Sequence, residues 1–119
     1  MRFLFLIHLN EDEMDALPAA EMNALNRNHL ALNEELRGSG HFIEAEALEP
    51  SSATASVRLR QGKVSVTDGP FAETKELVAG FYLIEARDRD EAIEIAGRIP
   101  SLPHGTVEVR PIRQLLVTE

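Results

Sequence analysis

Two segments of this chain are apolar on both faces, and this feature constrains the fold more than any other. In residues 2–8, three large apolar side chains alternate with two leucines and a histidine. Residues 77–85 likewise carry apolar side chains on both faces. Strands of this kind are covered on both sides, because large apolar patches are rarely left in water.

Hydrophobic periodicity predicts two helices. The first is predicted over residues 17–37, where an apolar stripe recurs at steps of three and four and includes one histidine: Met22, Leu25, His29, Leu32 and Leu36. The second begins at Asp88 and Glu91, which have the spacing of a capping box, and runs to Ile99 before Pro100.

Four further strands complete the predicted sheet, at residues 41–48, 53–60, 63–67 and 106–112. The middle two form a hairpin around Gln61-Gly62, with one buried face and one solvent-exposed face. Residues 10–15 and 68–76 are predicted loops. The order β-α-β-(β-β)-β-α-β predicts an α+β fold, a ferredoxin-like split βαβ with an inserted β-hairpin.

Two helices can cover only one face of such a sheet. The second face then needs another cover, and the simplest is the same face of a second copy. We therefore expect a homodimer with sheet-to-sheet packing and a ligand cleft between sheet, hairpin and partner. The alternative is a monomer whose hairpin folds across the open face. Residues 1–113 are expected to form a single domain, followed by a short tail at 114–119.

Charge and composition exclude several classes of protein. The chain has 119 residues, with 20 Asp and Glu against 12 Lys and Arg, for a net charge of −8. This acidic balance argues against nucleic-acid or membrane partners. The longest apolar run, residues 3–7, is too short to span a membrane, and the start does not resemble a secretory signal. We expect a cytoplasmic protein.

Motifs for several common chemistries are missing from the sequence. The chain has no cysteine, no phosphate-binding glycine loop and no Gly-x-Ser-x-Gly turn. Its four histidines include no His-x-x-x-His pair with metal-ligand spacing. We expect neither a cofactor nor a bound metal.

The most distinctive stretch is Asp68-Gly69-Pro70-Phe71-Ala72-Glu73-Thr74-Lys75-Glu76. Its first three residues favour a turn, and Phe71 is predicted to anchor the loop in the core. The stretch resembles the signature of the DGPF-domain group within the YCII-related family of small bacterial proteins. The resemblance covers nearly the whole chain, including residues 2–8, 34–38, 80–84, 104–105 and 108–111.

This resemblance implies a ferredoxin-like subunit in a dimeric α/β-barrel arrangement. Some YCII-like relatives act, or are proposed to act, on small oxygenated or chlorinated aromatic-ring products, using a His and an Asp. His29-Leu30 and Gly40 match the spacing of a His-Leu pair and a following glycine in such relatives. Genes of the DGPF group often neighbour alternative sigma factors, which implies a regulatory link.

His29 and Asp68 are the candidate catalytic residues. His29 interrupts an apolar stripe and therefore faces the sheet, where it could act as a general acid or base. Alternatively, it is a core histidine bonded to a backbone carbonyl or to Asn26. Asp68 could orient His29 or hold a ligand hydroxyl; alternatively, it only forms the turn.

Four more residues are candidate ligand-binding residues: His8, Glu73, Lys75 and Tyr82. For His8 the alternative is a half-exposed strand end, and for Glu73 and Lys75 a salt bridge at the rim.

Two functions remain open from the sequence, besides a purely structural role. One is an isomerase- or lyase-type enzyme that acts on a small polar, aromatic-derived or oxo-acid compound through His29 and Asp68. The other is a non-catalytic dimer that binds a metabolite or a regulator. The first is favoured by the histidine on the core stripe, the second by the lack of a complete catalytic constellation.

Overall fold

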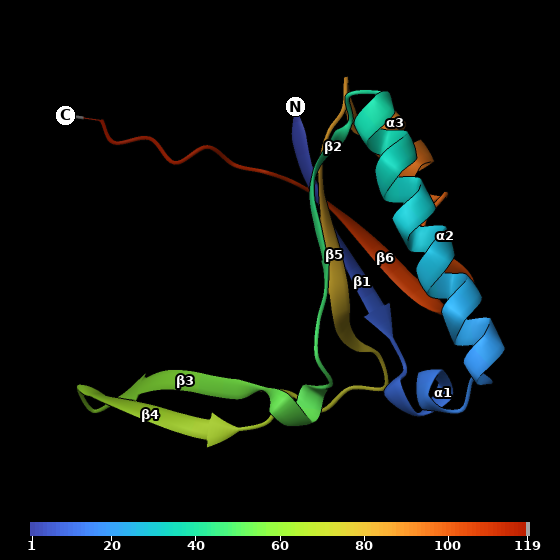
Figure 1. Cartoon of the computed structure of the whole chain (residues 1–119). Coiled ribbons are helices and arrows are strands. Elements are labelled where there is room, and N and C mark those ends of the chain that lie inside the picture. The colour runs from blue at the N-terminus through green and yellow to red at the C-terminus, as the bar shows by residue number, and fades with distance from the viewer. Residues whose placement is uncertain (119) are drawn as a thin grey trace.

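The computed structural model describes residues 1–118, whose helices and strands are drawn in Figure 1. In chain order the elements are β1 (Arg2–Leu9), α1 (Glu11–Asp15), α2 (Ala19–Gly38), β2 (Phe42–Ala47), η1 (Ser51–Ala53), β3 (Ala55–Arg60), β4 (Lys63–Asp68), β5 (Leu77–Glu85), α3 (Arg89–Ala96), η2 (Leu102–His104) and β6 (Gly105–Pro111). Glu119, the end of the predicted tail, lies outside the described residues.

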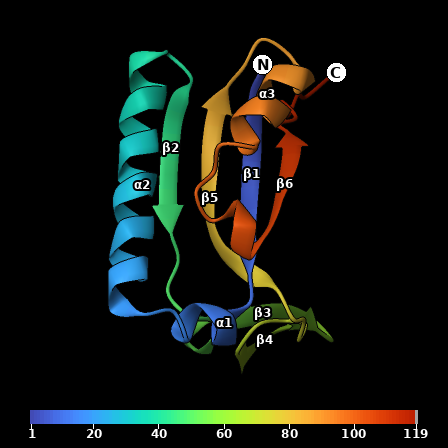
Figure 2. The same ribbon diagram turned by 90° about the vertical axis from the view of Figure 1, so that its right-hand side faces the viewer.

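The larger sheet has the strand order β2-β5-β1-β6, and every neighbouring pair is antiparallel. Strand β5 lies between β1 and β2, which are joined through α2. Strand β1 in turn lies between β5 and β6, which are joined through α3. Figure 2 shows this interleaving from the side of the helices. The predicted α+β class is confirmed, with antiparallel sheets and with β3 and β4 forming a separate hairpin.

The core lies between the helices and one face of this sheet. Phe3 and Phe5 of β1 are fully buried there, opposite Ile84 and Tyr82 of β5. Leu36 supplies the matching apolar surface from α2, and α3 contributes Ala92, Ile95 and Ala96. At about 25 cal/mol per Å², burying such side chains is the main stabilising contribution to a domain of this size.

No described helix covers the other face of the sheet (Figure 1). The cross-strand register pairs Leu4 with Leu83 and Leu6 with Phe81 on that face. These four side chains are only partly buried. The apolar alternation on both faces of β1 and β5 is therefore present, but the chain itself shields one face only.

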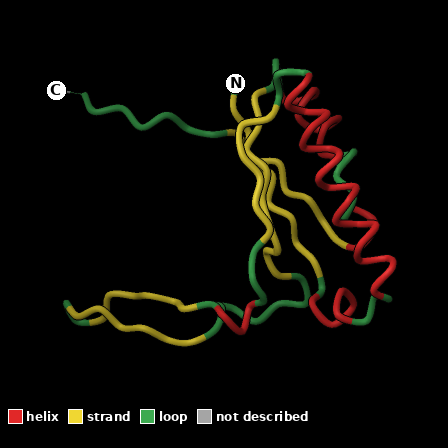
Figure 3. The backbone as a smooth tube through the Cα atoms, viewed as in Figure 1, coloured by secondary structure: helices red, strands yellow, loops and turns green. Residues whose placement is uncertain are grey.

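Two arms project from the open side of the sheet (Figure 3). One is the β3–β4 hairpin, which turns at Gln61 and Gly62 with positive φ at both residues. The other is the C-terminal segment after β6. The radius of gyration is 16.6 Å, whereas a compact chain of this length has about 13.5 Å. The protomer is thus C-shaped rather than compact.

The prediction that the hairpin buries one face is not met within a single chain. Its apolar face consists of two cross-strand pairs, Val57 with Val66 and Leu59 with Val64. These side chains are 62–72% exposed. The strand alternation is as predicted, but the hairpin projects away from the sheet and nothing in the same chain covers it.

Two local predictions are wrong. Residues 10–15 were expected to be a loop, but α1 forms there because the Asn10 side chain accepts a hydrogen bond from the Glu13 backbone N–H at 3.0 Å. Phe71 was expected to anchor its loop in the core, but its side chain is 79% exposed. That loop extends from the base of the projecting hairpin, too far from the core for Phe71 to be buried in it.

Candidate functional site

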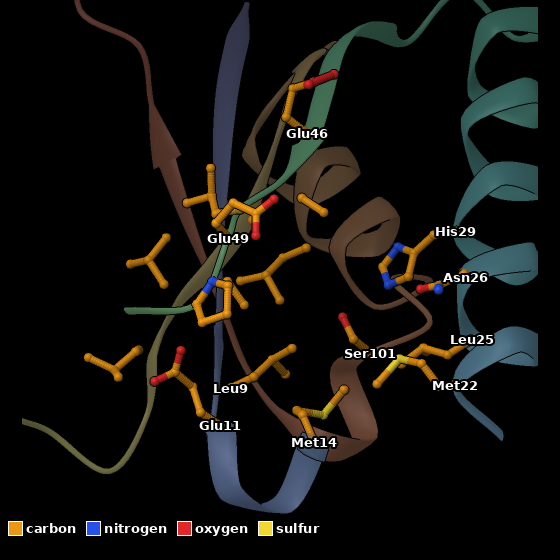
Figure 4. A pocket seen from close by; sticks show the side chains of 18 of the residues that line it. Leu9, Glu11, Met14, Met22, Leu25, Asn26, His29, Glu46, Glu49 and Ser101 are labelled. Carbon is orange, nitrogen blue, oxygen red and sulfur yellow. The ribbon is translucent and has the colours of Figure 1, made fainter. Parts of the chain in front are cut away.

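A cavity of about 770 Å³ lies between α2 and the helix-covered face of the sheet, and we call it the helix-side cavity. Helix α2 lines it with Met22, Leu25, Asn26 and His29, which recur at helical spacing and so share one face. The volume is within the usual range for small-molecule sites. Figure 4 shows His29 and Asn26 projecting from the helix into this space.

His29 contacts Tyr82 across the cavity wall. Its Nδ1 lies 3.0 Å from the Tyr82 hydroxyl oxygen, and that hydroxyl is also 3.5 Å from the His29 backbone oxygen. Burial lowers the pKa of His29 and raises the pKa of Tyr82 to about 12. At neutral pH the pair is therefore an uncharged imidazole and an uncharged phenol.

Both contacts of the Tyr82 hydroxyl can form together in one arrangement only. The Nδ1–H of His29 donates to the phenol oxygen, and the phenol O–H donates to the His29 carbonyl. A neutral imidazole protonated at Nδ1 keeps a free lone pair on Nε2. His29 then has an acceptor available for a ligand proton.

The same cavity is lined by two residues with an unpartnered polar atom. Ser101 is 2% exposed, and its Oγ has no hydrogen-bond partner. The Oδ1 of Asn33 is also buried and unpartnered. Buried polar atoms are almost always paired, so these two mark positions where a ligand or an ordered water completes the structure.

Carboxylates line the cavity from α1, from β2 and from the segment after β2: Glu11, Asp12, Asp15, Glu46 and Glu49. Figure 4 shows three of them, Glu11, Glu46 and Glu49. Glu46 pairs with Phe81, so its side chain leaves β2 on the open face. Glu11 is held in place by Ser51, whose backbone N–H donates to it at 2.7 Å and whose hydroxyl also donates to it. These hydrogen bonds lower the pKa of Glu11, so it is ionised at neutral pH.

A second cavity, of about 950 Å³, lies at the base of the hairpin, between β3, the end of the sheet and residues 70–77. His8 lines it from β1. Because side chains alternate along β1, His8 lies on the same face as Leu4 and Leu6. Its Nε2 contacts the carboxylate of Glu108 on β6.

The structure separates the candidate site residues suggested by the sequence. His29 and Tyr82 share the helix-side cavity, whereas His8 lines the cavity at the hairpin base. Asp68 ends β4, where it pairs with Ala55 of β3. It is not brought to His29, because the hairpin and α2 lie on opposite sides of the sheet (Figure 1).

Glu73 and Lys75 lie in the exposed loop after the hairpin, and no described salt bridge joins them. Both are adjacent in sequence to residues that line the second cavity, at the base of the hairpin: Glu73 precedes Thr74, and Lys75 lies between Thr74 and Glu76.

Sequence reasoning did not identify Asn33, Ser101 and the carboxylates of the cavity. One signal was available for Asn33, because Asn26, His29 and Asn33 follow one another at steps of three and four. Ser101 gave no such signal, since it lies in a turn whose position depends on the packing of α3. Within residues 1–118, no three His, Asp or Glu side chains are grouped closely enough to bind a metal ion.

Among the described residues, no helix combines the length and apolarity needed to cross a bilayer.

Comparisons with known proteins agree with this architecture. The chain is 33% identical over 114 residues to an uncharacterized protein of Rhizobium meliloti (strain 1021), an alignment that covers 94% of this chain and 92% of the relative. The model of the YCII-related domain matches residues 1–116. The chain therefore belongs to the YCII-related domain family.

Proposed function

We propose that the helix-side cavity binds a small organic molecule and that His29 exchanges a proton with it. The observation that carries this proposal is the His29–Tyr82 contact of 3.0 Å in a largely apolar cavity of suitable size. An uncharged imidazole held by a second side chain is the usual arrangement of a general base.

The reaction class that suits this pair is an isomerase- or lyase-type proton transfer. Nε2 of His29 takes a proton from an acidic C–H or O–H of the ligand. In an isomerisation the imidazolium returns that proton to another atom of the same molecule; in an elimination the proton leaves with the departing group. Tyr82 keeps its own proton throughout, because its pKa is about 12. It orients the ring, and we assign this role to Tyr82 rather than to Asp68.

The imidazole of His29 provides the direct test. In ¹⁵N-histidine-labelled protein, we expect a neutral ring protonated at Nδ1, with a pKa below 6.5. His29→Gln assigns the signal, and His104→Gln is the matched control outside both cavities. A ring protonated at Nε2, or doubly protonated at pH 7, would contradict the proposed base.

Turnover separates the enzyme from a binding protein. For a substrate that the protein converts, we expect His29→Gln to lower kcat by about 10²–10⁴-fold and His104→Gln to leave it unchanged. A ligand that binds beside His29 without being converted would instead support the non-catalytic function.

We also propose that a second copy of the chain covers the open face, in a dimeric α/β-barrel arrangement. The partly buried stripe of Leu4, Leu6, Phe81 and Leu83 supports this, as does the exposed apolar face of the hairpin. A two-stranded hairpin is marginally stable alone in water. The hairpin, residues 55–68, also carries three cations and one acid in a chain with 20 acids, so its charge is complementary to that of an acidic partner surface.

A further inference from the structure

We propose that the helix-side cavity selects a cationic ligand, an amine with an apolar body, and disfavours carboxylic acids. This rests on the proposed ligand site and adds the chemical class of its occupant. It also separates the candidate substrates, because an oxo acid and an amine carry opposite charges.

The charge around the cavity favours a cation. The described lining residues include neither Lys nor Arg, and four carboxylates whose strand register does not place them on the open face, Glu11, Asp12, Asp15 and Glu49. A cleft lined by one sign of charge, with low-dielectric walls, concentrates ligands of the opposite sign. An anionic ligand would meet four like charges without a cation to pair with it.

Glu11 holds a fixed position at the edge of the cavity. Ser51 donates both its backbone N–H and its hydroxyl to this carboxylate. The charge of Glu11 therefore stays at the cavity edge instead of swinging into solvent. A fixed charge interacts more strongly with a bound ligand than one on a mobile side chain, because no ordering entropy opposes the contact.

The polar atoms inside the cavity favour the same ligand, independently of the acidic residues. The unpartnered Oδ1 of Asn33 can only accept a hydrogen bond, and Nε2 of His29 is free to accept one in the arrangement derived above. Ser101, buried and unpartnered, can accept as well as donate. Such an interior needs donors from the ligand. An ammonium group brings three, whereas a carboxylate brings none.

The remaining lining includes the apolar residues Met14, Met22 and Leu25. These apolar side chains fit a hydrocarbon or aromatic ring. The whole cavity therefore suits a molecule with an apolar body and a cationic end.

Three probes with the same phenyl body test this preference: 2-phenylethylamine, 2-phenylethanol and phenylacetate. Binding is measured by NMR titration of the full chain at low ionic strength, following the signals of Ser101 and His29. We expect the amine to bind at least about tenfold more tightly than the acid, with the alcohol between them. The preference should shrink in 0.5 M salt, because screening weakens interactions with partly exposed charges.

Variants locate the origin of the preference. Asp15→Asn with Glu49→Gln removes two lining charges from exposed positions, so the fold is retained. We expect the amine-to-acid ratio to fall by about threefold to tenfold. The matched control is Glu21→Gln with Glu94→Gln, which removes the same charge from exposed positions outside the lining and should leave the ratio within about twofold.

The outcomes distinguish this inference from the proposed function. If phenylacetate binds as tightly as the amine, or more tightly, the cationic preference is wrong while the ligand site stands. If both double variants change the ratio equally, the preference comes from overall charge and not from the cavity, and the inference is again wrong. If none of the probes shifts the signals of Ser101 or His29, the ligand site itself is contradicted.

Discussion

The two faces of the four-stranded sheet differ in cover far more than in composition. In β1, Phe3 and Phe5 face the helices and are fully buried, while Leu4 and Leu6 face the open side and are only partly buried. The helix-covered face also holds the cavity with His29, and the open face is flanked by the hairpin. This chain therefore covers one face of the sheet and leaves the other open, and the proposed dimer rests on that difference.

The largest expected effect concerns the covered face. Phe5→Ala should lower the free energy of unfolding by about 3–5 kcal/mol, because it removes a ring from a fully packed position. Denaturant titration should give this loss at every protein concentration, since the contact is made within one chain. Phe81→Ala is the matched control on the open face. We expect the free energy of unfolding that it removes to grow with protein concentration, because the wild-type protein gains stability from the proposed dimer. Equal, concentration-independent losses would mean that both faces are completed within the protomer.

The next effect concerns the open face itself. Leu83→Asp places a carboxylate in the middle of the proposed sheet-to-sheet contact and should weaken the dimer at least about 100-fold. Sedimentation velocity at micromolar concentration should then show a 13.2 kDa species in place of one of twice that mass. Ile93→Asp makes the same change at an exposed position of α3 and should leave the dimer intact.

The hairpin gives a second route to the same question. Leu59→Ser with Val64→Ser changes side chains that are already exposed, so the protomer keeps its fold. We expect the dimer to weaken at least about tenfold through lost apolar burial. A wild-type protein that sediments as a monomer at these concentrations would end the dimer proposal.

A smaller effect is expected from the polar pair on the covered face. Tyr82→Phe removes the hydroxyl and leaves Nδ1 of His29 without its partner. The free energy of unfolding should fall by about 1–3 kcal/mol, the usual result of leaving a partly buried polar group without a hydrogen-bond partner. Denaturant titration measures the change. A loss below about 0.3 kcal/mol would show that the contact does not position the ring.

The pH dependence of stability follows from the lowered pKa of His29. The unfolded chain binds a proton near the ordinary value of 6.5, whereas the folded protein binds it only at lower pH. Stability should therefore be unaffected by this group above 6.5, and should decline as pH falls from 6.5 toward the folded pKa. His29→Gln should reduce this decline. If the wild-type protein became more stable as pH falls over that interval, the expected pH dependence would be contradicted.

Much of the fold could be predicted because its signals are local. The alternation in residues 2–8 and 77–85, the Asp88 cap and the Gln61-Gly62 turn each depend on neighbours in sequence. The direction of the hairpin could not be predicted, because alternation gives the two faces of a strand pair but not its angle to the sheet. A five-residue helix such as α1 is missed for a related reason, since one asparagine cap is too little pattern to detect.

Only part of the candidate site could be predicted from the sequence, because its contacts join segments that are far apart in the chain. The stripe on the first helix correctly placed His29 against the sheet, but its partner Tyr82 lies 53 residues away. Pairing His29 with Asp68 followed the family resemblance, and the topology puts the hairpin on the opposite side of the sheet. Only the cross-strand register decides which face each residue of β5 presents.

The smallest expected effect concerns Ser101. It tests whether the buried hydroxyl of Ser101 lacks a hydrogen-bond partner until a ligand binds to the covered face. Its hydroxyl is buried without a partner, so Ser101→Ala removes no hydrogen bond from the free protein. The free energy of unfolding should stay within about 0.5 kcal/mol or rise slightly, because desolvation of the hydroxyl no longer opposes folding. Binding of 2-phenylethylamine should nevertheless weaken about threefold to tenfold, since the ligand loses an acceptor. A drop in stability above 1 kcal/mol would mean that an ordered water already satisfies this hydroxyl. In that case the covered face would be complete without a ligand, and Ser101 would have no part in binding one.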